Sequence, residues 1–149
     1  MFDPAASASG RGAVAEQPLA LQSDPPGRGR TVVVTGAAGF VGCHACGMLA
    51  TGGWRVRALV RNAAKAAERL AHLPVEIRIG DIREEAYLAS AMDGAAAVVH
   101  LAAVAVERNG DTYESANANA TRSVIEAAAA AKVRRLLHVS QNGADSKSP

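Results

Sequence analysis

The stretch TVVVTGAAGFVG, residues 31–42, decides the fold of this chain. Thr31–Thr35 is a short β-branched run, which is the pattern of a strand buried on both faces of a parallel sheet. Gly36–Gly42 follows as a G-x-x-G-x-x-G turn, and the residues from Phe40 to Ala50 predict a helix. A strand, a glycine-rich turn and a helix in this order predict a dinucleotide-binding turn.

Each glycine of the turn has a physical role in such a site. Gly36 lets the chain turn sharply off the strand, Gly39 leaves room for a pyrophosphate, and Gly42 lets the helix lie close to the sheet. The N–H groups at the helix start then face the phosphates, helped by the helix dipole. The alternative is a strand–helix connection that binds no ligand. The remaining residues here are expected to line the nucleotide or complete the local packing: Thr35, Ala38, Phe40 and Val41.

The alternation of strands and helices continues along the chain. Further strands are predicted over Arg55–Val60, Val75–Ile79, Ala97–Leu101 and Arg135–Ser140. Further helices are predicted over Asn62–His72, Glu84–Met92 and Thr112–Ala131, the last with capping-box spacing between Asp111 and Glu114. Strict alternation predicts an α/β fold, a Rossmann-type doubly wound parallel sheet of about five strands with right-handed crossovers.

Composition separates an N-terminal extension from this domain. Residues 1–30 contain several prolines and glycines and show no sustained hydrophobic period, which predicts a disordered or loosely packed segment. A targeting peptide is the alternative, although Asp3, Glu16 and Asp24 do not suit an acid-poor transit sequence. The Rossmann domain is predicted over residues 31–149.

Charge and cysteine usage exclude several function classes. The formal net charge is +2 with both signs interspersed, so no nucleic-acid partner is expected. No apolar run reaches the roughly 18–20 residues that a membrane span needs, and no secretory signal is present. Two cysteines do not make a disulfide framework. A cytoplasmic location is the simplest expectation, with peripheral membrane attachment through a partner protein as the alternative.

The cysteines and histidines do not predict a metal site. Cys43 and Cys46 form a C-x-x-C pattern on the helix after the glycine turn, without a second pair of ligands. They are interpreted as two small residues that pack one turn apart. His100 and His138 lie inside predicted strands and are expected to be satisfied sheet residues.

The glycine turn and four later segments resemble one family. TGAAGFVG resembles the T-G-x-x-G-x-x-G motif of extended short-chain dehydrogenases/reductases, the NAD-dependent epimerase/dehydratase group. The later segments agree in order and spacing: Gly80–Ile82, Val99–Ala103, Asn117–Ala128 and Leu137–Ser140. Ala120 and Ser123 depart mildly from the family's helix pattern. Within the family, the chain most resembles atypical members, such as the Rossmann-type accessory subunit of respiratory complex I. The resemblance rests on Arg61 after the second strand and on residues 140–145. Many such members hold NADPH tightly.

The resemblance implies roles for individual residues. Asp81 is expected to hydrogen-bond the adenine amine, with help from the backbone of Ile82. Ser140 is expected to contact the substrate or a catalytic Tyr. The residues expected on the nicotinamide side and in the helix motif are Leu101, Ala102, Ala103 and Asn117.

Arg61 favours NADP(H) over NAD(H). An acidic residue after the second strand usually reads the ribose 2′-hydroxyl, whereas an Arg there suits a 2′-phosphate. Arg61 stands near that offset, and residues 54–67 contain no Asp or Glu. The alternative is a solvated charge at a strand end. Asp81 has an alternative as well: together with Glu84 it could be the N-cap of the next helix.

The family's Tyr-x-x-x-Lys pair is missing from this chain. Tyr87 and Tyr113 lack a Lys four residues later, so the motif is expected after Pro149. The chain is therefore interpreted as an N-terminal part, truncated before the later strands and the substrate lobe, that is not expected to transfer hydride alone. Its fifth strand would expose Leu136, Leu137 and Val139 at an edge, which predicts a chain that is either marginally stable or oligomeric through that edge.

Three function classes stay open at this point. The first is an oxidoreductase or epimerase whose small-molecule substrate is unknown. The second is a non-catalytic NADPH-binding accessory or assembly subunit of the complex I type. The third is a regulator that senses NADP(H).

Overall fold

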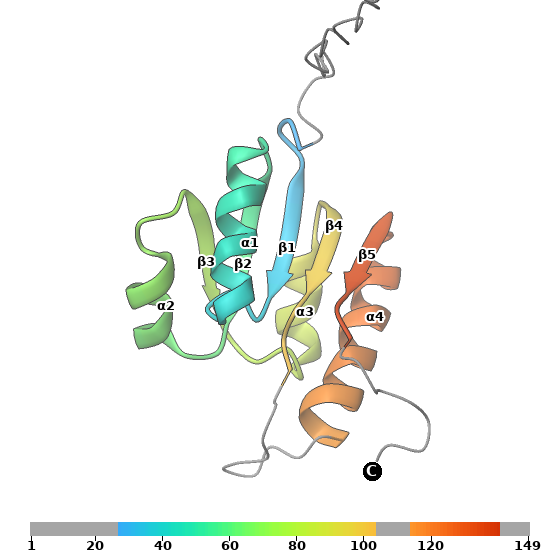
Figure 1. Ribbon diagram of the computed structural model, residues 1–149. Helices are drawn as coiled ribbons and strands as arrows, with labels where there is room; N and C mark the ends of the chain where they lie inside the picture. The colour runs from blue at the N-terminus through green and yellow to red at the C-terminus, as the bar shows by residue number, and fades with distance from the viewer. Residues whose placement is uncertain (1–26, 104–113, 141–149) are drawn as a thin grey trace, which may run out of the picture.

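The structure is a computed structural model that describes residues 27–103 and 114–140, without the side chains of residues 115 and 116. The strands are β1 (Thr31–Thr35), β2 (Arg55–Val60), β3 (Val75–Ile79), β4 (Ala95–His100) and β5 (Arg135–His138). The helices are α1 (Phe40–Thr51), α2 (Ala63–Leu70), α3 (Glu85–Met92), the π-helix η1 (Glu114–Asn119) and α4 (Ala120–Ala130). Strands and helices alternate along the chain as the sequence predicts (Figure 1).

The five strands form one parallel sheet in the order β3-β2-β1-β4-β5. The chain runs outward from β1 to β3 and then crosses back to β4 on the other side of β1. The switch point of this doubly wound sheet therefore lies between β1 and β4, which is where such sheets bind ligands. The Rossmann-type fold is confirmed.

Helices cover both faces of the sheet and divide the core into two layers (Figure 1). On one face Val32 and Val34 of β1 pack with Cys46 of α1 and Leu70 of α2. On the other face Val33 packs with buried residues of α3 and α4. The alternation of Val32, Val33 and Val34 between two cores explains why this strand is apolar at every position.

The observed bounds differ from the predicted ones mainly at the last helix. The sequence predicts one helix over Thr112–Ala131, whereas the described part begins as the π-helix η1 and continues as α4. Both helix types place apolar residues on one face, and the sequence pattern does not encode the change in hydrogen-bond offset. The predicted capping box cannot be followed, because Asp111 lies outside the described residues. The strand β5 ends at His138, two residues before the predicted end.

A short turn before β1 already belongs to the described fold. The Gly29 N–H donates to the carbonyl of Gly53 at 3.2 Å, and the Arg30 guanidinium lies 4.8 Å from the ring centroid of Trp54. Gly29 and Arg30, which precede the predicted start of the domain, thus contact the loop before β2. Residues 1–26 lie outside the described part. Among the described residues, no helix is both long and apolar enough to cross a membrane.

The glycine turn is held in close backbone contact with β4 and with α1. Gly36 has a φ of +67°, and a Cβ there would lie 2.7 Å from the nitrogen of Ala102. A Cβ on Gly42 would overlap the carbonyl oxygen of Gly36. Both positions therefore require glycine, as the sequence predicts, although Gly42 brings the helix against the turn itself.

We expect Gly42→Ala to destabilise the fold by about 1–3 kcal/mol, because the added methyl group would force the turn and α1 apart. The free energy of unfolding in urea measures the effect. Gly47→Ala is the matched control in the same helix, because a Cβ there meets only Leu73 at 3.6 Å. That control should be neutral or gain up to about 1 kcal/mol in helix propensity. Equal effects of the two substitutions would contradict the packing argument.

Candidate nucleotide-binding cleft

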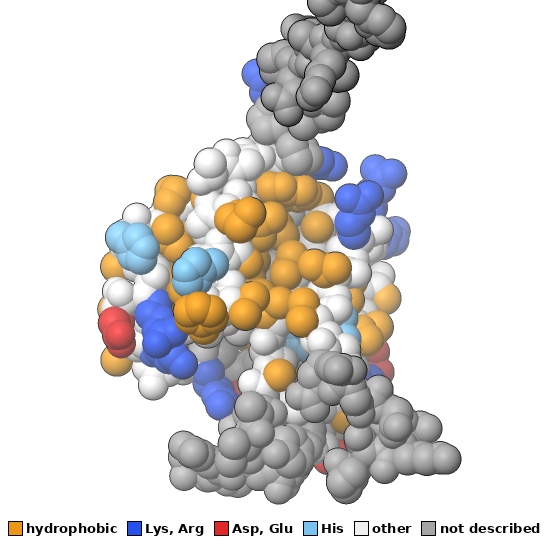
Figure 2. All heavy atoms as spheres, viewed as in Figure 1, with side chains coloured by type: hydrophobic (Ala, Val, Ile, Leu, Met, Phe, Trp, Pro, Cys, Tyr) orange, Lys and Arg blue, Asp and Glu red, His pale blue; other side chains and the backbone are white. Residues whose placement is uncertain are grey.

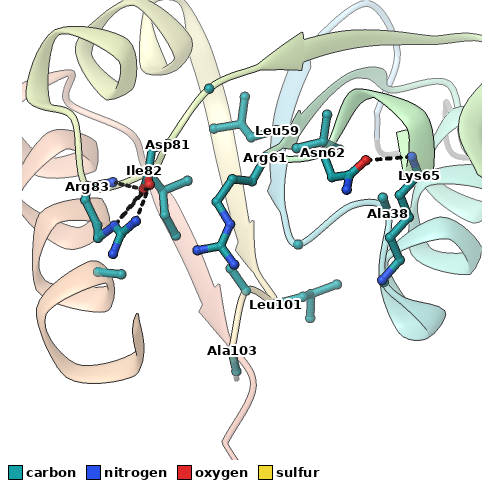
Figure 3. A pocket seen from close by; sticks show the side chains of 16 residues that line it. Ala38, Leu59, Arg61, Asn62, Lys65, Asp81, Ile82, Arg83, Leu101 and Ala103 are labelled. Atoms are coloured by element: carbon teal, nitrogen blue, oxygen red, sulfur yellow. Dashed lines mark hydrogen bonds and ion pairs between the residues drawn. The ribbon is translucent and has the colours of Figure 1, made fainter. Parts of the chain in front are cut away.

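A cleft of about 290 Å³ opens at the carboxyl ends of the strands, at the switch point of the sheet (Figure 3). The strand register aligns the carboxyl ends of the strands that form the cleft walls. Thr35 at the end of β1 pairs with Leu59 and His100, and Val60 at the end of β2 pairs with Ile79. The segments that follow β1, β2, β3 and β4 therefore meet at one edge. This position is the usual ligand site of an open α/β sheet.

Most of the predicted site residues line this cleft. The predicted site residues that line the cleft are Gly36, Ala38, Gly39, Arg61, Asp81, Ile82, Leu101, Ala102 and Ala103. The lining also includes residues that the sequence did not single out, namely Leu59, Val60, Asn62, Lys65, Gly80, Arg83 and Ala120. Of the predicted site residues, Phe40, Val41, Gly42, Asn117 and Ser140 do not line the cleft as described.

The start of α1 is suited to an anion. Gly39 is the N-cap residue, and its N–H donates to the carbonyl of Gly36 at 2.9 Å. The first N–H groups of a helix have no acceptor within the helix, and the dipole makes this end positive. The first turn of α1, which the structure describes fully, carries no acidic side chain. Backbone groups at this end can therefore bind a phosphate.

The expected packing role of two turn residues is wrong. Phe40 is 76% exposed and Val41 is 59% exposed, so neither side chain completes the packing of the turn. Both stand at the start of α1, where their side chains point away from the sheet. Thr35, by contrast, is fully buried as expected.

Three cationic side chains line the cleft around the end of β2 (Figure 3). Arg61 follows β2 directly, and Lys65 lies in the first turn of α2. The Asn62 side chain accepts a hydrogen bond from the Lys65 N–H at 2.9 Å and so begins that helix. Arg83 comes from the loop after β3. The N-cap at Asn62 and the Lys three residues later are a sequence signal that could have placed Lys65 beside Arg61.

Asp81 is the acidic residue among the described cleft residues, and Arg83 binds it. Its carboxylate accepts from the Arg83 backbone N–H at 2.9 Å and from the Arg83 guanidinium at 3.0 Å. These hydrogen bonds lower the pKa of Asp81, with a further contribution from the positive charge of Arg61. The carboxyl is therefore held ionised and oriented at the cleft edge. The interpretation of Asp81 as a helix N-cap is wrong, because Glu84 occupies the N-cap position of α3.

Tyr87 packs against Gly80 of the cleft lining, and its hydroxyl is engaged in a hydrogen bond. Its hydroxyl donates to the carbonyl of Arg78 at 2.9 Å, and its ring packs on Gly80, where a Cβ would clash. Burial raises the pKa of Tyr87, the largest of several effects. Tyr113 lies outside the described residues.

A buried histidine lies at the end of β4, next to the cleft wall. His100, the last residue of β4, is fully buried, and its ring nitrogens lie 2.6 Å from Thr35 Oγ1 and 2.9 Å from Thr121 Oγ1. Burial lowers the pKa of His100 to about 4, and the neighbouring His138 adds to this. His100 is thus a satisfied sheet residue, as predicted.

The cysteines and the remaining candidates are not among the described residues that line the cleft. Cys46 is buried in the core, which raises the pKa of its thiol to about 11, and Cys43 is half-buried on the same helix. Among the described residues, no group of three or more potential ligands is arranged to hold a metal ion. Asn117 lies half-buried in η1, and Ser140 is exposed after β5.

Comparisons with known proteins agree with this arrangement. A model of the NAD dependent epimerase/dehydratase family matches residues 32–143. Sterol demethylase protein B of Methylococcus capsulatus is 36% identical over 116 residues, which cover 76% of this chain and 35% of that protein. Ceramide reductase of Caulobacter vibrioides is 35% identical over 106 residues, covering 71% of this chain and 33% of that protein. This chain spans about a third of the length of these relatives.

A solved structure shares the fold. The structure of Pen from Bacillus thuringiensis superposes with a TM-score of 0.72 at 28% identity, covering 80% of this chain and 39% of that one. These matches do not extend to the complex I accessory subunit, so that narrower resemblance stays a prediction.

We expect the stability of this protein to fall as the pH drops from 7 to 5, because unfolding releases His100 from its low pKa. The unfolded imidazole titrates near 6.5 and the folded one near 4, so the unfolded chain binds more protons in this range. The contribution of His100 to the free energy of unfolding is therefore fully present above about pH 6.5. It declines by at most about 1.4 kcal/mol per pH unit as the pH falls and levels off below about pH 4.

Urea unfolding of the wild type and His100→Gln measures this slope. Glutamine keeps hydrogen-bonding groups but does not titrate, so the slope should disappear between pH 7 and 5. The exposed His72 provides the matched control, and His72→Gln should keep the wild-type slope. A slope that survives in His100→Gln would exclude His100 as its source.

Proposed function

Because this chain belongs to the NAD-dependent epimerase/dehydratase family, we propose that it is the NADP(H)-binding lobe of an oxidoreductase or epimerase of the extended short-chain dehydrogenase/reductase type. The family defines the cofactor class as a nicotinamide dinucleotide. The observation that carries the preference for NADP(H) is the position of Arg61, which lines the cleft at the end of β2 beside the glycine turn.

Arg61 is suited to read a 2′-phosphate for two reasons. It stands at the strand end where the adenosine ribose of a bound dinucleotide lies in Rossmann folds. It is also one of three cations that line the cleft, and it lies between Lys65 on one side and Arg83 on the other (Figure 3). A guanidinium binds phosphate in a two-pronged manner, and a nearby ammonium adds charge without demanding a fixed geometry. Asp81 is paired with Arg83, so it does not repel an anion strongly.

The other parts of the nucleotide have suitable partners. The start of α1 and the backbone of Gly39 would bind the pyrophosphate. Asp81 and Ile82 would bind the adenine, and Leu101, Ala102, Ala103 and Asn117 would contact the nicotinamide side. Phe40, Val41 and Gly42 would contribute backbone N–H groups rather than side chains, since two of these side chains are exposed and the third is absent.

The bound cofactor supplies hydride exchange with a carbon atom of the substrate. The described residues of this chain bind and orient the nucleotide, and Ser140 would contact the substrate where β5 ends. The general acid of the family, a Tyr with a Lys four residues later, has no counterpart within residues 1–149. The names of the relatives refer to a sterol and a ceramide, which favours a carbonyl or alcohol group on a lipid-like molecule as substrate.

We expect Arg61→Ala to weaken NADPH binding by roughly 10- to 100-fold, because charge-assisted hydrogen bonds to the 2′-phosphate are lost. NADH lacks that phosphate, so its dissociation constant should change less than about twofold. Titrations followed by nicotinamide fluorescence measure both constants.

Arg55→Ala is the matched control for this experiment. Arg55 is exposed at the opposite end of the same strand, so its loss should leave both dissociation constants unchanged. Equal losses of NADPH and NADH affinity in Arg61→Ala would show that Arg61 does not read the 2′-phosphate. Binding with no turnover in any preparation that carries the Tyr and Lys would favour the accessory or sensor alternatives instead.

We further propose that the chain associates with a second copy through the edge of β5. This strand pairs with β4 on one side. Leu137 within it and Val139 just after it are 55% and 53% exposed, whereas Leu136 packs against the core. Exposed hydrophobic side chains also gather on α1, where Phe40, Val41 and Met48 face outward (Figure 2). An apolar strand edge favours pairing with another edge.

Size-exclusion chromatography at increasing concentration tests this association. We expect the wild type to elute earlier as concentration rises, and Leu137→Lys to stay monomeric because a charge at the edge opposes pairing. Ile79→Lys on the opposite edge strand β3 is the control and should behave as the wild type. A wild type that remains a monomer at high concentration would contradict the proposal.

A further inference from the structure

We propose that His100 is a positioning residue, which in its neutral form with the proton on Nε2 ties together the elements that carry the nucleotide and substrate residues. This inference deepens the proposed function and rests on it only for the binding readout. Its structural part stands on the hydrogen bonds around the imidazole.

Three contacts surround the imidazole of His100 in the interior of the protein. Its Nδ1 lies 2.6 Å from Thr35 Oγ1 on β1, and its Nε2 lies 2.9 Å from Thr121 Oγ1 on α4. The ring of His138 on β5 stacks against it at a centroid distance of 5.3 Å. His100 on β4 therefore contacts three further elements with one side chain.

The hydrogen bonds of Thr35 determine where the proton of His100 lies. The backbone N–H groups of Leu101 and Ala102 donate to Thr35 Oγ1 at 3.3 and 3.2 Å, and the Leu101 N–H is shared with the Thr35 carbonyl oxygen, also at 3.3 Å. A hydroxyl accepts two hydrogen bonds and donates one, so the two N–H groups use both acceptor positions. The Thr35 proton must then point to Nδ1 of His100, which acts as acceptor. Nε2 consequently carries the proton of the neutral ring and donates a hydrogen bond to Thr121 Oγ1.

Each partner of His100 is a neighbour of a site residue. Thr35 directly precedes Gly36 of the glycine turn, and Leu101 directly follows His100 in the cleft wall. Thr121 directly follows Ala120, which lines the cleft where α4 begins. His138 stands two residues before Ser140, the residue proposed to contact the substrate. The buried chain of hydrogen bonds thus sets the relative positions of these segments.

Among these contacts, the hydrogen bond between His100 and Thr121 joins the sheet to the start of α4, directly after a π-helix. The π-helix η1 carries Asn117, and π-helical turns are uncommon and recur at functional sites. Ser123, in the same first turn, donates only to the carbonyl of Asn119 within its own helical segment. Thr121 therefore ties this turn to the sheet, whereas the Ser123 hydroxyl bonds only within the helical segment.

The first test is the protonation of His100 in the wild type, measured by long-range ¹H–¹⁵N NMR correlations on a ¹⁵N-labelled chain at pH 7. We expect a neutral ring with an unprotonated Nδ1 and a protonated Nε2. In Thr35→Val, which lacks the donor to Nδ1, this preference should be lost. A protonated Nδ1 in the wild type, or an unchanged signature in Thr35→Val, would overturn the proposal without any need for ligand.

The second test separates positioning from packing with three variants of the first turn of α4. Thr121→Val keeps the shape but removes the hydrogen bond, Thr121→Ser restores it, and Ser123→Ala is the control. We expect Thr121→Val to weaken the binding of NADPH and NADH alike by about fivefold and to speed amide hydrogen exchange over residues 117–124. Thr121→Ser should recover both properties, and Ser123→Ala should match the wild type.

These outcomes keep the two proposals apart. Equal loss for both nucleotides in Thr121→Val contrasts with the NADPH-specific loss expected for Arg61→Ala. If the wild type binds neither nucleotide, the proposed function fails for this chain, while hydrogen exchange and the NMR signature still decide the role of His100. Wild-type exchange rates in Thr121→Val would overturn the positioning role.

Discussion

The absence of a side chain at Gly36 is the constraint on which the rest of this structure depends. The backbone there adopts a φ of +67° and lies so close to the end of β4 that a Cβ would stand 2.7 Å from the backbone of Leu101 and Ala102. The carboxyl ends of β1 and β4 can therefore approach each other across the switch point of the sheet. The hydroxyl of Thr35 also lies close to this end of β4, because it accepts hydrogen bonds from the N–H groups of Leu101 and Ala102. Without this contact, the two halves of the doubly wound sheet would not share one cleft.

The charges of the cleft differ from those of the chain as a whole. The chain has a formal net charge of only +2, yet three cationic side chains converge where β2, α2 and the loop after β3 meet. The carboxylate of Asp81 in this region is held by Arg83, which keeps it ionised while offsetting its charge. A local excess of positive charge beside a helix N-terminus suits a ligand with phosphates at two points. This pattern agrees with membership of a family that uses nicotinamide dinucleotides.

Much of the fold and part of the site could be predicted from the sequence for local reasons. The β-branched run of β1, the spacing of Gly36 and Gly42 and the alternation of elements each depend on neighbours in the chain. Arg61 could be predicted because its distance from the glycine turn is short and typical. Lys65 follows the Asn62 cap and could have been placed from the same local spacing, whereas Arg83 and the partners of His100 could not, because their places depend on the loop after β3 and on strand order and register. The exposure of Phe40 was missed for the same reason, since apolar character alone does not say which helix face meets the sheet.

The sequence by itself determined the class of fold, the location of the glycine-rich turn and the cationic residue after β2. These properties follow from backbone conformation and short-range spacing, which local residue types control. Only the tertiary structure decided that His100 reaches β1, β5 and α4 at once, and that Arg83 turns back onto Asp81. Such contacts join residues distant in the chain or depend on how a loop leaves the sheet, and hydrogen-bond geometry selects them only after the strands are paired. The strand order β3-β2-β1-β4-β5 brings the motifs that follow separate strands together at one cleft, because the carboxyl ends of parallel strands lie at the same edge of the sheet.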